Sequence, residues 1–208
     1  MPARSAAALI AAIAWAALAL RTRITILEFT AAGDSVGEGL WHLAGYFTVW
    51  TTTLVALAMT AVAVGVWPGG RKASDSVLAA LALYVTVVAI VNHTLLRGLI
   101  DFTPIEEIAD ALLHYVTPAL VVCWWIAFAP KAGLRYRDAF IWLTYPLAYC
   151  AAALVRGAYS GWYPYPFLDV RVLGQQGVAF NAAGLGAVIA VTGLVIIFTA
   201  RALGAGKE

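Results

Sequence analysis

The sequence predicts an all-α polytopic membrane protein: one domain over residues 1–208 that is a bundle of six transmembrane helices. Of the 208 residues, 63% are hydrophobic and only 12% are charged. The mean hydropathy is +0.87. Soluble domains carry about 25% charged residues and about 45–50% apolar residues, and disordered chains are polar, so neither class fits. Two cysteines cannot frame a small secreted module, and a net charge of +2 is too small for a nucleic-acid surface.

Six stretches have the length that crossing a bilayer requires, about 20 mostly apolar residues each. They lie at about 5–27, 44–67, 76–96, 109–129, 138–155 and 178–200. Because they are too long for barrel strands and lack strict alternation, we expect helices. Turn and breaker residues separate them, at 68–70, 97–98, 130–133 and in the long segment 157–177. Arg21 and Arg23 follow the Ala-rich run of the first stretch without a small-residue cleavage site, which indicates a retained helix rather than a signal peptide.

Basic residues set the expected orientation. With six spans both termini share a side, and that side carries eight of the 13 Lys and Arg residues. These eight are Arg4, Arg71, Lys72, Lys131, Arg135, Arg137, Arg201 and Lys207. The positive-inside rule therefore predicts cytoplasmic termini in the cytoplasmic membrane. The longer connections near 28–43, 97–108 and 156–177 then face outward, and long connections more often carry function.

Polar residues near the outer helix ends form the main functional signal. Thr48, Asn92, His93, His114 and Asn181 lie about three to five residues inside the outer ends of four predicted spans, with Asn92 and His93 on the same span. At 1.5 Å per residue they share a layer roughly 5–8 Å below the outer ends. Polar groups inside a membrane are costly, so each is a functional hypothesis.

Thr48 and His114 form the most reactive combination in this layer. A hydroxyl becomes nucleophilic when an adjacent base takes its proton, and histidine suits that task. Such a pair inside the bilayer would act on acyl esters of lipids. The alternatives are a threonine bonded to its own preceding turn and a buried histidine bonded to a backbone carbonyl. No orienting carboxylate is evident at this depth, and Asp101 and Asp110 are the nearest by loop position. Asn92, His93 and Asn181 are candidate oxyanion or orienting groups, without a choice among them.

The segment before the last stretch is dense in aromatic residues and prolines. Proline blocks helix continuation, so we expect a rigid loop that either forms an interfacial aromatic belt or covers the outer mouth as a lid. Its candidate substrate-binding or lid residues are Arg156, Trp162, Tyr163, Tyr165, Phe167 and Asp169. Arg156 could pair with Asp169 or hold a substrate carboxylate. No metal site or cofactor is expected, because soft ligands are few and P-loop, HExxH, CxxC and Rossmann patterns are not found.

Three short motifs carry a family resemblance. Tyr46-Phe47-Thr48, the block 113–118 (LHYVTP) and the block 161–168 (GWYPYPFL) resemble the androgen-induced protein family, in order and spacing over residues 44 to 200. The chain looks like a bacterial branch of that family. The resemblance implies a six-helix membrane threonine hydrolase that cleaves fatty acid esters of hydroxy fatty acids, with Thr48 as the nucleophile and His114 as the essential histidine. Residues 49–53 differ from the eukaryotic pattern. This difference bears on which lipid ester is the substrate more than on the type of reaction.

Two other functions are compatible with the sequence. His93 and His114 could ligate one haem in an electron-transfer protein. A lipid-binding or transport protein without chemistry is the other alternative, and broken helices or an inverted repeat would support it. The expected partners are the bilayer and a membrane lipid or fatty acid ester substrate, with the active site toward the outer leaflet. The sequence does not predict the oligomeric state.

Overall fold

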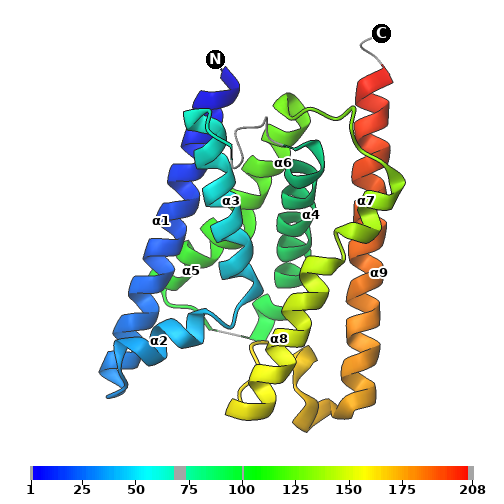
Figure 1. Cartoon of the computed structure of the whole chain (residues 1–208). Coiled ribbons are helices and arrows are strands. Elements are labelled where there is room, and N and C mark those ends of the chain that lie inside the picture. Colours follow the sequence, from blue (N-terminus) through cyan, green and yellow to red (C-terminus); the bar gives the residue numbers. More distant parts are fainter. Residues whose placement is uncertain (1, 68–73, 100, 206–208) are drawn as a thin grey trace. The chain divides into compact units, whose positions relative to one another are not determined.

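In the computed structural model, which describes residues 2–67, 74–99 and 101–205, every regular element of these residues is a helix. The all-α prediction is confirmed (Figure 1), and six helical segments of the described residues are long and apolar enough to cross a membrane. They are Pro2–Ala31, Phe47–Val64, Asp75–Leu99, Pro104–Phe128, Tyr136–Ser160 and Val170–Leu203. The predicted break at 68–70 lies outside the described residues. The same holds for three of the basic residues used to predict the orientation, Arg71, Lys72 and Lys207.

The chain divides into two compact units, Met1–Lys131 and Ala132–Glu208. The first unit contains four of the six spans and the second unit contains two. That all six helices form one domain stays a prediction.

The first unit is a bundle in which α1 (Pro2–Ala31) packs along α3 (Phe47–Val64), and α4 (Asp75–Val91) packs on α6 (Thr117–Phe128). The helix α4 is apolar on all sides, and nearly every side chain from Leu78 to Val88 is buried. A helix that is hydrophobic all round belongs in an interior, so α4 forms the centre of this bundle.

The next two candidate spans after α3, Asp75–Leu99 and Pro104–Phe128, each contain a π-helical turn. Past α4 the helix continues as η2 (Asn92–Leu96), a π-helix, and η3 (Arg97–Leu99), a 3₁₀-helix. The next span begins as α5 (Pro104–Ala111) and passes through η4 (Leu112–Val116), a second π-helix, into α6. Single π-helical turns inside α-helices are frequent at functional sites.

The helix α5 begins five residues before the predicted start at 109. Thr103 and Glu106 form a capping box, and Pro104 occupies the first helical position, where its missing N–H is no loss. Asp110 therefore lies within a continuous helix, one turn before His114, rather than at the edge of a loop.

The connection near 28–43 contains a helix that the sequence analysis did not predict, α2 (Val36–Leu43). Ser35 and Glu38 close a capping box at its start. The backbone N–H and hydroxyl of Ser35 donate to the Glu38 carboxylate, which lowers the pKa of Glu38. The signal was the Ser-x-x-Glu spacing.

The second unit comprises α7 (Tyr136–Ile141), α8 (Thr144–Ser160), η5 (Pro166–Leu168) and α9 (Val170–Ala205). The helix α9 is kinked at Gly174, whose φ of 65° and ψ of 170° are non-helical and favour glycine. The helix α8 extends to Ser160 and a first helical turn begins at Val170, but the uninterrupted part of α9 starts only after Gly174, close to the predicted start at 178.

Candidate active site

Thr48 and His114, 66 positions apart in the chain, meet in the first unit. Thr48 is the second residue of α3, and His114 is the middle residue of η4. The Oγ1 atom of Thr48 lies 3.2 Å from Nε2 of His114. Thr48 is 8% exposed, so the contact is shielded by the bundle. The structure thus brings together two residues that the sequence predicts at the same depth below the outer helix ends.

The other ring nitrogen of His114 fixes its tautomer. Nδ1 lies 2.8 Å from Oδ1 of Asp110 and 3.1 Å from the backbone oxygen of the same residue. Since both are acceptors, we assign the proton to Nδ1, which leaves the lone pair of Nε2 facing the Thr48 hydroxyl. Carboxylate, imidazole and hydroxyl then form one chain in the order that activates a nucleophile.

Asp110, the third member, is only 6% exposed, so its charge needs compensation. Arg97 Nη1 donates to Oδ2 at 2.8 Å, and Asn92 Nδ2 donates to Oδ1 at 3.3 Å. Arg97 also pairs with Glu107 at 3.1 Å. The carboxylate that orients His114 is thus itself held by donors from η2 and η3, and Glu107 holds Arg97.

The three residues proposed as oxyanion or orienting groups have different surroundings. Asn92 joins the cluster as a donor to Asp110. His93 contacts the neighbouring Tyr115 instead, with Nδ1 3.3 Å from the hydroxyl. Asn181 belongs to the second unit and donates to the backbone oxygen of Phe167 at 3.1 Å. Within the described residues none of the three has a hydrogen bond to Thr48.

Thr48 itself carries a donor that the sequence analysis missed. Its backbone N–H lies in the first turn of α3, where no intrahelical acceptor exists, and it has no hydrogen bond to any other described residue. The helix N-terminus adds a partial positive charge. The predicted start at 44 placed Thr48 one turn inside the helix and so hid this donor.

In the second unit, two arginines stack on the predicted lid. The guanidinium of Arg156 lies 4.8 Å from the ring centroid of Trp162, and that of Arg171 lies 5.5 Å from the ring centroid of Tyr163. Asp169 pairs with Arg171 at 2.7 Å, so its described partner is not Arg156. Hydrogen bonds from Arg171 lower the pKa of the Asp169 carboxyl.

Aromatic packing orders the rest of this segment. The rings of Tyr165 and Phe167 are stacked with centroids 5.0 Å apart. Tyr163 packs so closely on Gly157 that a Cβ added there would lie 2.1 Å from the ring. The predicted lid is therefore an ordered segment held against α8, as the prolines and aromatic residues suggested.

Among the described residues no group of three or more His, Cys, Asp or Glu side chains is placed to hold a metal ion. No family model, curated protein or solved structure matches the chain. The resemblance to the androgen-induced protein family therefore stays a prediction from its three motifs.

Proposed function

We propose that the protein is an intramembrane hydrolase of lipid carboxylic esters, with Thr48 as the nucleophile, His114 as the general base and Asp110 as the positioning residue. The observation that carries the proposal is the continuous chain from the Asp110 carboxylate through His114 to the Thr48 hydroxyl. A threonine in a merely structural role would bond its own preceding turn, as Thr53 does to the backbone oxygen of Val49 at 2.7 Å.

In the first half-reaction Nε2 of His114 takes the proton of the Thr48 hydroxyl. Oγ1 forms a bond to the ester carbonyl carbon, the ester C–O bond breaks, and His114 returns the proton to the leaving alcohol. Asp110 stays ionised and stabilises the imidazolium in between. The product of this step is an acyl-threonine.

In the second half-reaction water replaces the alcohol. His114 takes a proton from water, the hydroxyl attacks the acyl carbon, and the Thr48 ester bond breaks to release a fatty acid while Oγ1 regains its proton. The backbone N–H of Thr48 supplies one donor to the oxyanion, as the nucleophile's own N–H does in serine proteases. In this proposal the water enters from the helix ends, because Thr48 lies in the first turn of α3.

The substrate class follows from location. A reactive hydroxyl inside a helical bundle meets molecules that partition into the bilayer, and esters of long-chain acids do so. Fatty acid esters of hydroxy fatty acids are the first substrates to test, since the three sequence motifs point to them. In this proposal the protein resides in the cytoplasmic membrane with the site toward the outer leaflet, as the distribution of basic residues predicts.

Contacts of the histidines argue against the haem alternative. Both ring nitrogens of His114 are engaged, Nε2 by Thr48 and Nδ1 by Asp110. Axial ligation would have to break the Thr48 contact, and His93 contacts Tyr115.

The test is hydrolysis by the purified full-length protein in detergent, measured as fatty acid released from an ester of a hydroxy fatty acid. We expect Thr48→Ala to abolish release, Thr48→Ser to retain it in part, and His114→Ala to lower it by about 10²–10⁴-fold. Mass spectrometry should find the acyl group on the peptide that contains Thr48.

Thr53→Ala is the matched control, because it removes a hydroxyl from the same helix that bonds only its own turn. Equal hydrolysis by Thr48→Ala and the wild type would disprove the nucleophile. Lipid binding without turnover by a folded wild-type protein, over a range of ester substrates, would favour a non-catalytic lipid-binding protein.

A further inference from the structure

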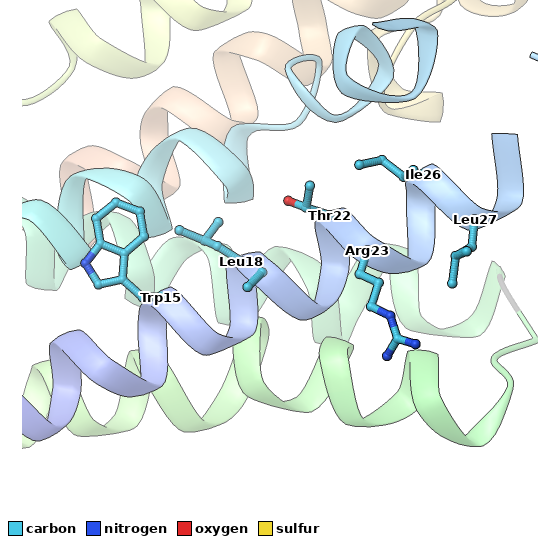
Figure 2. Close-up of a pocket in the computed structure, with 7 residues that line it drawn as sticks. Trp15, Leu18, Thr22, Arg23, Ile26 and Leu27 are labelled. Atoms are coloured by element: carbon cyan, nitrogen blue, oxygen red, sulfur yellow. The ribbon is translucent and has the colours of Figure 1, made fainter. Parts of the chain in front are cut away.

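A shallow groove, largely open to the outside, lies on the surface of α1 between Trp15 and Leu27; in Figure 2, Thr22 and Ile26 project from one side of the helix and Arg23 and Leu27 from the other. Its volume is about 530 Å³, within the range of small-molecule sites, and it is open along its length. The lining is apolar apart from Thr22 and Arg23. All lining residues come from α1, so the groove exists within the first unit.

Arg23 is the unusual member of this lining. It is exposed, and its side chain has no hydrogen bond or ion pair with another described residue. Arg21, two residues earlier, instead pairs with Glu28 at 3.7 Å. The positions next to Arg23 on the helix surface, such as Ala19 and Leu27, are apolar. A cation in such a place attracts an anion or reaches the membrane interface.

The position of Arg23 along α1 places it at that interface. Arg4, near the start of the helix, donates to the backbone oxygen of Ala63 and marks one edge of the span. About 20 residues cross the hydrocarbon layer, so the opposite edge falls beside Arg23. The part of the groove from Trp15 to Ala19 then lies in the hydrocarbon layer, and the guanidinium lies at head-group level.

We propose that this groove binds a long-chain fatty acid, with the carboxylate on Arg23 and the alkyl chain along Ala19 and Trp15, which lie one and two turns before Arg23 on the exposed side of α1. The planar guanidinium matches a carboxylate with two parallel hydrogen bonds. The groove lies on the surface of a single helix, which fits one alkyl chain rather than the two chains of a phospholipid. The proposal concerns binding of a free acid and holds whether or not Thr48 hydrolyses esters.

The experiment measures equilibrium binding of radiolabelled palmitate to the full-length protein in nanodiscs of neutral phosphatidylcholine. Arg23→Gln should weaken binding roughly tenfold or more, the value of one hydrogen bond to a charged group. The matched control Arg21→Gln removes an equal charge from the same helix and should leave binding within about twofold of the wild type.

A second pair of variants tests the chain position. Ala19→Trp fills the groove and should abolish binding, whereas Ala16→Trp, on the same helix but outside the lining, should not. Palmitate with a photoreactive group at the chain end should label α1 near Trp15. Thermal melting of each variant in detergent establishes that it is folded.

Three outcomes would overturn the proposal. Equal binding by folded Arg23→Gln and Arg21→Gln removes the role of the cation. Equal affinity for palmitate and its neutral methyl ester removes the role of the carboxylate. Displacement of palmitate by low concentrations of phosphatidylglycerol assigns the groove to a two-chain anionic phospholipid instead.

Discussion

Replacing Asp110 by Asn keeps the shape of the side chain and removes its charge, which makes it a direct test of the positioning role. In the wild type the carboxylate accepts the Nδ1 proton of His114 at 2.8 Å and so stabilises the imidazolium that forms during catalysis. Its own partner Arg97 keeps a second acceptor, Glu107, in the variant. The fold should therefore survive the change.

The size of the effect follows from two contacts of Nδ1. A hydrogen bond to a charged group is worth about 1.5–3 kcal/mol, which corresponds to a loss of about 10- to 150-fold in kcat. The equivalent change in a serine protease costs about 10⁴-fold because the histidine adopts the wrong tautomer. Here the backbone oxygen of Asp110, 3.1 Å from Nδ1, still accepts the proton and preserves the tautomer. We therefore expect the smaller loss, with KM nearly unchanged.

The assay is steady-state ester hydrolysis by Asp110→Asn beside the matched control Glu107→Gln. Glu107 is an acid on the same helix that pairs with Arg97 and has no contact with His114. A kcat for Asp110→Asn above half the wild-type value would refute the positioning role. An equal fall in both variants would also refute it, since the effect would then come from Arg97 rather than from the imidazole.

Two further predictions concern the second unit. Gly157→Ala should lower its stability by about 1–3 kcal/mol, because the added Cβ would lie 2.1 Å from the Tyr163 ring, whereas Gly184→Ala meets no atom within 4 Å and should be neutral or stabilising. Thermal melting followed by tryptophan fluorescence compares the two, and equal melting temperatures would contradict the packing. The Asp169 carboxylate, whose pKa is lowered by hydrogen bonds from Arg171, should support the aromatic segment fully above its unfolded pKa of about 3.9 and lose that contribution as pH falls through the lower folded value. Protection factors for amide hydrogen exchange over 161–169, which are corrected for the pH dependence of intrinsic exchange, should therefore fall on acidification in the wild type, and Asp169→Asn should show the lower protection already at neutral pH.

Most of the fold could be predicted from the sequence, because the bilayer requires long apolar helices and these leave a plain compositional signal. The helix ends were less accurate for identifiable reasons. The extra helix α2 and the early start of α5 are both marked by capping boxes, Ser35 with Glu38 and Thr103 with Glu106. Such polar signals lie outside the apolar runs, so a search for hydrophobic stretches alone passes over them.

The pairing of Thr48 with His114 could be predicted because helix depth is nearly a linear function of residue number. The third member could not be found by the same argument while Asp110 was assigned to a loop. Asp110 and His114 are four residues apart. Once Thr103 and Pro104 are recognised as the start of the helix, both residues belong to the same helix, where this spacing places their side chains on one face. The orienting carboxylate could therefore have been predicted from the signals that mark the start of α5, although the depth argument did not identify it.

Which face of each helix is directed toward the site could be predicted less well than the depth, because two π-helical turns change the helix rotation there. His114 lies in η4 and Asn92 in η2, and a π-helical turn holds an additional residue compared with an α-helical turn. Residues on the two sides of such a turn are rotated by about 100° relative to a regular helix, so a 3.6-residue pattern continued through η4 assigns the wrong face. No residue type marks these turns in the way that a capping box marks a helix start. Depth, and the placement of His114 on the face of Asp110, could therefore be predicted from the sequence, whereas the faces of the residues that follow η4 required the structure.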